Sequence, residues 1–250
     1  MDLNRGKMQS FRNFLNEGIN DKGIFKAIFM GGTPGAGKSY VIKSVKSGNI
    51  EPKIVNVDKF LEFLSVQRNI DISDAGSDPF KALRDESKKL SKKELANFIN
   101  GALPLFIDGT SAKINNMVQR MGILEFFGYD IGMVWVQTDL DQALERARKR
   151  KRDVPEDFIK QVNEVSLKNK EFFKSKFKFF VEVSNNDGEL TDKVIKKVFN
   201  KVSGFFNKPI NNPIGNDFVK RMKEGNQKLL VPEIFDKGEI EKRLSIWFRK

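Results

Sequence analysis

The sequence of 250 residues contains no cysteine and no histidine. Without cysteine the chain has no disulfide bond, no thiol nucleophile and no zinc–thiolate site, and without histidine it has no imidazole base. Any acid–base chemistry must therefore use Asp, Glu, Lys or Tyr side chains. The absence of cysteine is compatible with a reducing cytoplasm.

Long hydrophobic runs are missing as well. No apolar segment approaches the ~20 residues of a membrane span, and no signal peptide is visible at the N-terminus. We therefore expect no membrane partner and a cytoplasmic location. A hydrophobic content of 39% and a charged content of 31% suit a globular protein with one α/β domain and a real core.

One glycine-rich segment is more informative than any other part of the chain. Residues 32–39 read Gly-Thr-Pro-Gly-Ala-Gly-Lys-Ser and fill the phosphate-binding pattern G-x-x-x-x-G-K-[ST] at every fixed position. An apolar segment that suits a buried strand precedes it, and residues 39–45 can open a helix. Glycines let the backbone turn its N–H groups towards phosphate oxygens, and the helix N-terminus adds partial positive charge. The segment predicts a nucleoside triphosphate ligand; the alternative is a chance glycine-rich turn.

The motif assigns separate roles to its last two residues. Lys38 is expected to reach the β- and γ-phosphates, and the Ser39 hydroxyl to hold Mg²⁺, so the predicted cofactors are ATP and Mg²⁺. The predicted nucleotide-binding residues of this segment are Gly32, Thr33, Pro34, Gly35, Ala36, Gly37, Lys38, Ser39 and Tyr40.

Strand and helix patterns alternate along the middle of the chain. Apolar segments that suit strands lie at 25–30, 53–57, 103–107, 132–137 and 179–183. Helical patterns lie between them, at 60–68, 91–101, 112–127, 139–150, 155–176 and 189–203. This alternation predicts a parallel sheet sandwiched between helices, and the ligands of such sheets bind beyond the carboxyl ends of the strands.

Two aspartates follow predicted strands at that edge. Asp108 closes an apolar strand in the Walker B manner, where a carboxylate can hold Mg²⁺ opposite Ser39. Asp58 ends the strand at 53–57 and can accept the proton of an attacking hydroxyl. A helix N-cap without a catalytic role is the alternative for Asp58, and spacing does not decide between the two.

An arginine-rich segment follows the fourth predicted strand and its helix. Every second residue from 146 to 152 is an arginine, and the segment ends before Pro155; these arginines are Arg146, Arg148, Arg150 and Arg152. Guanidinium groups over a triphosphate would neutralise charge on the transferring phosphoryl group and close the site against water. The alternative is a solvated basic helix end that is favourably placed for the helix dipole.

The chain carries a formal net charge of +12, and its basic residues are dense in residues 146–152 and after residue 190. One interpretation is a polyanionic partner, with DNA favoured among the nucleic acids. The other is a solvated Lys-rich surface together with arginines that serve ATP. Charge alone does not choose between them, and the sequence leaves the oligomeric state open.

Together these features resemble the P-loop kinases of the zeta-toxin and polynucleotide-kinase group, from about residue 25 to 188. The segments that carry the resemblance are 32–39, 56–58, 106–110, 128–130, 145–156 and 185–188. The resemblance implies a P-loop NTPase three-layer α/β/α sandwich, a five-stranded parallel sheet ordered 2-3-1-4-5, and a mobile lid around residues 146–154.

The resemblance also implies roles for individual residues. It makes Asp58 the catalytic base and matches Arg146, Arg150 and Arg152 to the lid arginines. Asn185 or its neighbour Asn186 falls where the group approaches the adenine, and Asn185 is the predicted contact.

The acceptor side departs from the group's pattern. The group often carries an arginine a few residues after the catalytic aspartate, whereas here Lys59 follows Asp58 at once, without the bidentate fork of a guanidinium. The segment 64–100 matches nothing that can be assigned. Its lysines could line a groove for an anionic acceptor or form a solvated helix face, which is slightly favoured; they are Lys88, Lys89, Lys92 and Lys93.

We expect residues 1–24 to form an N-terminal segment, 25–203 the kinase domain and 204–250 a small basic helical appendage. Two short helices are predicted in that appendage, near 216–225 and 238–249. Residues 15–18, Leu-Asn-Glu-Gly, resemble a cleavage site of tailed-phage head-maturation proteases. A phage-encoded chain would work in the host cytoplasm.

The resulting hypothesis is a phosphotransferase with an alcohol group as acceptor, in which Lys38, Asp58 and the lid arginines are catalytic. The favoured acceptor is a hydroxyl of nucleic acid, either a 5′ end or a hydroxymethylated base. Within kinases the alternative is a nucleotide sugar such as UDP-N-acetylglucosamine. Outside kinases the alternatives are an ATP-binding module that transfers nothing and a structural protein that kept the loop but lost catalysis.

Overall fold

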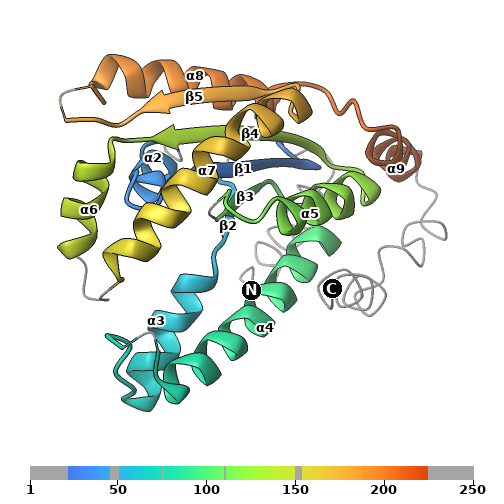
Figure 1. Ribbon diagram of the computed structural model, residues 1–250. Coiled ribbons are helices and arrows are strands. Elements are labelled where there is room, and N and C mark those ends of the chain that lie inside the picture. Colours follow the sequence, from blue (N-terminus) through green and yellow to red (C-terminus); the bar gives the residue numbers. More distant parts are fainter. Residues whose placement is uncertain are drawn as a thin grey trace, which may run out of the picture.

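The computed structural model describes residues 22–45, 51–74, 76–109, 111–149, 154–187 and 189–224 (Figure 1). The described strands form one parallel five-stranded sheet in the order β2-β3-β1-β4-β5, as predicted. They are β1 (Lys26–Gly32), β2 (Lys53–Val55), β3 (Leu105–Asp108), β4 (Asp130–Gln137) and β5 (Phe180–Ser184).

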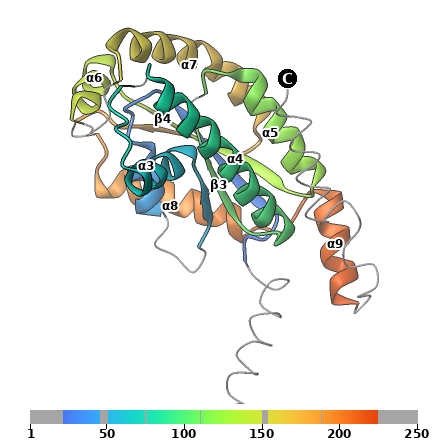
Figure 2. The same ribbon diagram turned by 90° about the horizontal axis from the view of Figure 1, so that it is seen from below.

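Helices cover both faces of this sheet (Figure 2). The described helices are α2 (Lys38–Val45), α3 (Val57–Arg68), α4 (Asp78–Asn100), α5 (Ile114–Phe126), α6 (Leu140–Arg148), α7 (Glu156–Lys176), α8 (Asp192–Asn207) and α9 (Pro213–Lys223). On one face Ala27 and Phe29 of β1 belong to a core shared with α4, α5 and α7. On the other face Ile28 and Met30 belong to a core shared with α2 and α8. Successive strand residues point to opposite faces, so the wholly buried β1 serves both layers of the three-layer sandwich.

Helix α4 is much longer than the predicted helix at 91–101. It begins at Ser77, whose hydroxyl accepts a hydrogen bond from the Phe80 backbone N–H at 3.3 Å in an N-cap arrangement. Its buried side includes the small polar residues Ser87 and Ser91. These serines interrupt the apolar period on which the sequence-based prediction depended, and so conceal the first half of the helix.

Helix α3 and the first half of α4 form a hairpin that extends away from the sheet (Figure 1). Leu61 and Leu64 of α3 pack against Phe80 and Leu83 of α4 in a small core of their own. The second half of α4 lies in the core of the main sheet through Leu95 and its neighbours. One helix therefore connects the hairpin rigidly to the sheet.

The C-terminal end of the described chain also differs from expectation. Helix α8 continues through Gly204 to Asn207 because Phe205 and Phe206 are buried on the face shared with α2. Helix α9 corresponds to the predicted helix near 216–225. The predicted helix at 238–249 lies outside the described residues, as does the protease-like segment 15–18.

A buried ion pair fixes the segment that leads to α9. The Lys26 side chain is almost fully buried, and its Nζ donates to Asp130 Oδ2 at 2.5 Å and to the Pro209 carbonyl at 2.8 Å. The Asp130 carboxylate also accepts the backbone N–H groups of Asn211 and Asn212, each at 2.8 Å. Asp130 thus joins β1, β4 and the chain before α9.

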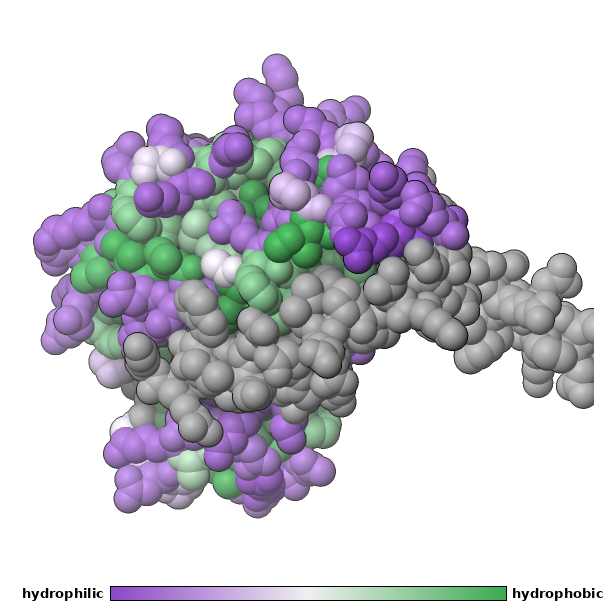
Figure 3. Space-filling model, turned by 90° about the vertical axis from the view of Figure 1, so that its right-hand side faces the viewer, coloured by the Kyte–Doolittle hydropathy of each residue, from purple (hydrophilic) through white to green (hydrophobic). Residues whose placement is uncertain are grey.

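The side of the molecule near α5 and α9 shows apolar surface among hydrophilic side chains (Figure 3). Large exposed apolar side chains on these two helices are Val118, Phe126 and Ile214. No helix within the described ranges is both long enough and apolar enough to cross a membrane.

Removing the Asp130 carboxylate should destabilise the protein strongly. Asp130→Ala leaves the Lys26 ammonium buried without its counter-charge, and breaking such a pair costs about 3–5 kcal/mol. The free energy of unfolding measured in urea should fall by about that amount. The matched control is Glu164→Ala, whose pair with Lys168 is exposed and should contribute about 1 kcal/mol or less. Equal losses in the two variants would contradict the structural role of Asp130.

Candidate active site

The phosphate-binding loop connects β1 to α2 at the carboxyl end of the central strand. Gly35 and Gly37 have φ values of +73° and +81°, a region that favours glycine. A Cβ atom at Gly35 would lie 2.6 Å from the Ala143 carbonyl oxygen, and one at Gly37 would lie 2.2 Å from Asn185 Nδ2. The loop is therefore held tightly between α6 and the segment after β5.

The predicted phosphate ligands begin at this loop. Lys38 Nζ donates to the Thr33 carbonyl at 2.8 Å and to the Gly32 carbonyl at 3.4 Å, so the ammonium group lies over the loop itself. Ser39 and Tyr40 in the first turn of α2 are exposed. Because the backbone N–H groups of a helix N-terminus favour anions, the arrangement fits the phosphates of a nucleotide.

Asn56 connects the two predicted carboxylates. Its Nδ2 donates to Asp108 Oδ2 at 2.8 Å, and its Oδ1 accepts the Asp58 backbone N–H at 2.6 Å. Asn56 is thus the N-cap of α3, and Asp58 lies in the first turn. This excludes the alternative in which the Asp58 carboxylate caps the helix, and the structure brings Asp58 and Asp108 to one edge of the sheet.

An arginine from α4 contacts the candidate base. Arg84 Nη1 lies 3.3 Å from Asp58 Oδ1, and both side chains are partly exposed. Lys59 turns away, pairing with Glu94 and lying over the Phe60 ring. The guanidinium that the sequence lacked after Asp58 is supplied from the unassigned segment 64–100. Arg84 and Asp58 are 26 residues apart in the chain, so no local sequence pattern could have predicted this contact.

Two further cations approach the same edge. A Cβ atom at Gly109 would lie 4.0 Å from Arg120 Nη1, which places this guanidinium of α5 beside the residue that follows Asp108. Burial lowers the pKa of Arg120 from its ordinary value. The pKa of Lys92 on α4 is also lowered, first by burial and then by the positive charges of Arg120 and Lys88.

The four lysines between Lys88 and Lys93 of α4 therefore differ in their surroundings. Lys88, Lys89 and Lys93 are exposed, and Lys88 pairs with Asp85 at 2.8 Å, as expected of a solvated helix face. Lys92 is partly buried beside another cation. The sequence-based preference for a solvated face fits the first three residues, and Lys92 is less exposed than they are.

The predicted lid arginine Arg146 lies on α6 and contacts the segment after β5. Its guanidinium donates to Gln142 Oε1 at 3.0 Å and to Asp187 Oδ1 at 2.9 Å. Arg148 is exposed and pairs with Glu156 at the start of α7. Arg150 and Arg152 lie outside the described residues, so their predicted roles stay predictions.

The loop after β5 contacts the phosphate-binding loop directly. Asn185 Nδ2 donates to the Ala36 carbonyl at 2.7 Å. Asn186 Oδ1 accepts the Asp139 backbone N–H at 2.8 Å and the Thr138 hydroxyl at 3.0 Å. Asn185, the predicted adenine contact, thus lies against the loop backbone, and its role toward adenine stays a prediction.

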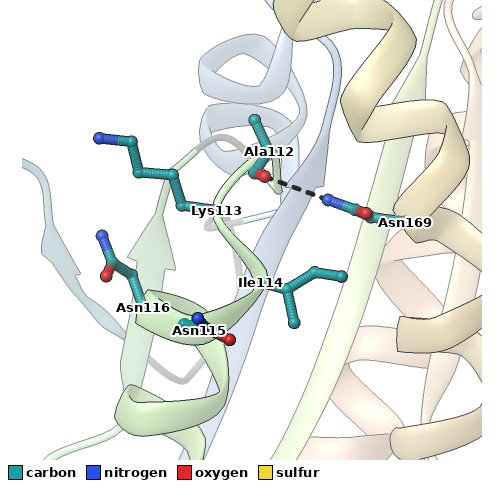
Figure 4. A pocket seen from close by; sticks show the side chains of 6 residues that line it. All are labelled: Ala112, Lys113, Ile114, Asn115, Asn116 and Asn169. Carbon is teal, nitrogen blue, oxygen red and sulfur yellow. Dashed lines mark hydrogen bonds between the residues drawn. The ribbon is translucent and has the colours of Figure 1, made fainter.

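The loop after β3 is held from two sides. Ser111 Oγ accepts the Gly32 backbone N–H at 3.2 Å, and Asn169 of α7 donates to the carbonyls of Ser111 and Ala112 at 2.8 and 3.1 Å. A surface pocket opens beside this loop at the start of α5 (Figure 4). Its lining residues are Ala112, Lys113, Ile114, Asn115, Asn116 and Asn169.

The donor types at this edge suit Mg²⁺ that is bound together with a nucleotide. Among the described residues no group of three or more acidic, histidine or cysteine side chains gathers into a metal site. Mg²⁺ bound to nucleotides, however, usually uses one or two protein oxygens, with phosphate oxygens and water completing the coordination. The Ser39 hydroxyl and the Asp108 carboxylate fit that smaller donor set.

Comparison with known protein families finds a model that matches this sequence. The model of an AAA domain matches residues 28–169, more than half of the chain. No curated protein matches the sequence.

Solved structures resemble the fold at low sequence identity. A candidate kinase from Chloroflexus aurantiacus J-10-fl is 14% identical with a TM-score of 0.51, covering 72% of this chain and 97% of that chain. Shikimate kinase from Bacteroides thetaiotaomicron is 16% identical with a TM-score of 0.41, covering 72% and 97%. The PezAT toxin–antitoxin system of Streptococcus pneumoniae is 17% identical with a TM-score of 0.47, covering 90% and 94%. The fold is that of a kinase-like P-loop NTPase.

Asn56 offers a test of how this edge is held together. Asn56→Ala removes the N-cap of α3 and the hydrogen bond to Asp108, and the loss of such a cap costs about 1–2 kcal/mol. Urea unfolding should show a loss of that size. Asn56→Asp keeps the cap acceptor but places a second carboxylate beside Asp108, so a loss in this variant reports the missing donor together with the repulsion between the two carboxylates. Wild-type stability in both variants would contradict the role given to Asn56.

Proposed function

We propose that this chain, which belongs to the AAA domain family, is an ATP- and Mg²⁺-dependent kinase that phosphorylates a hydroxyl group. The observation that carries the proposal is the connection through Asn56, which holds Asp58 and Asp108 together at the end of the sheet where the phosphate-binding loop lies. A nucleotide-binding module without an acceptor needs no carboxylate at Asp58. The arrangement therefore favours phosphoryl transfer over hydrolysis alone.

Each residue has a distinct task in this mechanism. When bound, Mg²⁺ would neutralise charge on the phosphoryl group that ATP supplies. Lys38 and the loop N–H groups would bind the phosphates, and Ser39 and Asp108 would hold the metal. Asp58 orients the acceptor hydroxyl and takes its proton at the carboxylate.

Arginines complete the site on its two sides. Arg84 holds the Asp58 carboxylate from the acceptor side, which limits its orientations. Arg146, Arg150 and Arg152 act as lid arginines that stabilise charge on the transferring group, and Arg146 must exchange its partner Asp187 to do so. Asn185 contacts the nucleotide from the loop after β5.

The proposed acceptor is a hydroxyl of nucleic acid, with DNA favoured, at a 5′ end or on a hydroxymethylated base. The net charge of +12 and the basic C-terminal region support a polyanionic acceptor. A nucleotide sugar such as UDP-N-acetylglucosamine is the second candidate, because the partly buried cations Lys92 and Arg120 suit a small phosphorylated molecule equally well.

Transfer of label from γ-labelled ATP tests the mechanism. We expect Lys38→Ala and Asp58→Asn each to lower transfer on the order of 10²–10³-fold, the usual cost of removing one such group. Asp58→Asn should retain ATP binding, because Asp58 does not contact the nucleotide. Asp157→Asn is the matched control, since this carboxylate is almost fully exposed.

The acceptor panel contains 5′-hydroxyl DNA and RNA, duplex DNA with hydroxymethyluracil, and UDP-N-acetylglucosamine. Label on one of them identifies the acceptor class. Transfer by Asp58→Asn at the wild-type rate would falsify the mechanism. ATP hydrolysis with no label on any acceptor would favour the ATP-binding module.

A further inference from the structure

Helix α8 has an outer face that carries charge of one sign. Its buried apolar side chains belong to the core shared with α2, and the residues on its other side are exposed. Because residues three and four apart lie on the same side of a helix, four exposed lysines form one basic face; they are Lys193, Lys196, Lys197 and Lys201. The acidic residues of α8 are limited to Asp192 in its first turn. The helix therefore does not balance its basic face with carboxylates of its own.

Lysines on other helices have different surroundings. On α4 and α7 several lysines pair with a carboxylate three or four residues away, as Lys81 does with Asp78 and Lys168 with Glu164. Within the part of the chain that the structure describes, no lysine of the basic face forms an ion pair. The face thus presents four positive charges to solvent that the fold does not use.

A glycine lies on the same side of α8. Gly204 follows Lys197 by seven residues, which is about two helical turns. A Cβ atom at Gly204 would meet no heavy atom of the described chain within 4 Å, and its φ is not positive. Alanine would fit there and is the better helix former, so the fold gives no reason for the glycine. A residue without a side chain in the basic face lets a partner approach the helix backbone closely.

The composition of the face indicates which polyanion fits it. From Lys193 to Lys201 it extends about 12 Å, at about 1.5 Å per residue. Phosphates of one duplex strand follow each other at about 3.4 Å along the axis, so the face spans roughly three or four of them. No large apolar or aromatic side chain of α8 is exposed. Stacking on bases of a single strand needs aromatic side chains, and insertion into a membrane surface needs apolar ones, whereas a duplex backbone needs neither.

We infer that the basic face of α8 binds the phosphate backbone of a nucleic acid duplex without reading its sequence. The lysines contact phosphates as point charges, and the exposed amide of Asn200 adds a hydrogen-bond donor among them. Helix α8 begins after the loop that carries Asn185 and runs back from that edge of the sheet (Figure 1). The face is therefore a surface separate from the candidate active site, and the inference holds whether or not the bound duplex is phosphorylated.

Duplex binding at several salt concentrations tests the inference. A fluorescently labelled DNA duplex is titrated with the full chain, and its anisotropy gives the affinity. The test variant combines four substitutions by another good helix former; they are Lys193→Gln, Lys196→Gln, Lys197→Gln and Lys201→Gln. Log affinity should fall less steeply with log salt in this variant, by roughly 0.9 for each lysine that neutralises a phosphate and about 2–4 in all.

A matched variant loses the same charge elsewhere. It neutralises four exposed lysines of α4 and α7 that pair with carboxylates; the substitutions are Lys81→Gln, Lys160→Gln, Lys168→Gln and Lys174→Gln. Binding through overall charge predicts equal changes of slope in the two variants, whereas the inference predicts the wild-type slope in the matched one. Equal slopes in the two variants, or a wild-type chain that binds no duplex, would overturn the inference. Thermal unfolding curves show that each variant is folded.

A single substitution tests the face without removing a lysine. Asn200→Asp places a carboxylate between Lys197 and Lys201, and its repulsion of phosphate should weaken duplex binding severalfold. Asn216→Asp makes the same change at an exposed position of α9 and should leave the affinity unchanged. Equal affinities of these two variants would contradict the inference.

Two further probes compare the other polyanions. Single-stranded DNA of the same length and vesicles of phosphatidylcholine with phosphatidylserine are each titrated with the wild-type chain and the test variant. Binding to the duplex should be tighter than binding to either probe. Equal affinity for the single strand overturns the duplex assignment, and vesicle binding that alone depends on the four lysines identifies a membrane surface instead. Because these assays need neither ATP nor transfer, a failure of the labelling assay leaves their result interpretable.

Discussion

The amide side chain of Asn56 makes the two hydrogen bonds on which the geometry of the candidate site depends. Val55 of β2 is paired with Ile107 of β3, so the next residue of each strand reaches the same edge of the sheet. The amide donates across that edge to Asp108 and accepts from the first turn of α3. Only a side chain with both a donor and an acceptor can do this. An aspartate would keep the cap but could not donate to Asp108.

The position of the start of α3 determines where the hairpin of α3 and α4 lies relative to the sheet. The direction of α3 positions the hairpin, and the small core around Leu61 and Leu83 fixes α4 against α3. Helix α4 then returns to the main core at Leu95, so it is anchored at both ends. The side chains between these anchors, Arg84 among them, therefore have fixed positions relative to the sheet edge that carries Asp58 and Asp108.

The sequence predicted the features that depend on local patterns. The phosphate-binding loop, the five strands and the position of Asp108 at the end of β3 all follow from short segments, and the sheet order followed from the family resemblance. The start of α4 was missed because Ser87 and Ser91 occupy buried positions without contributing to an apolar period. The contact of Asp58 with Arg84 was missed because it depends on residues that only the fold brings together.

The net charge of +12 does not by itself indicate a nucleic acid partner, because its meaning depends on where the charges lie. Exposed lysines that pair within their own helix, such as Lys81 with Asp78 and Lys168 with Glu164, contribute little to stability or recognition. A polyanion that crosses many basic residues releases a counterion at each, with a slope of log affinity against log salt of roughly −0.9 per duplex phosphate neutralised. A site that neutralises a single phosphate gives a shallow slope. The number of phosphates engaged, rather than the sign of the charge, therefore separates a strand of DNA from a small phosphorylated acceptor.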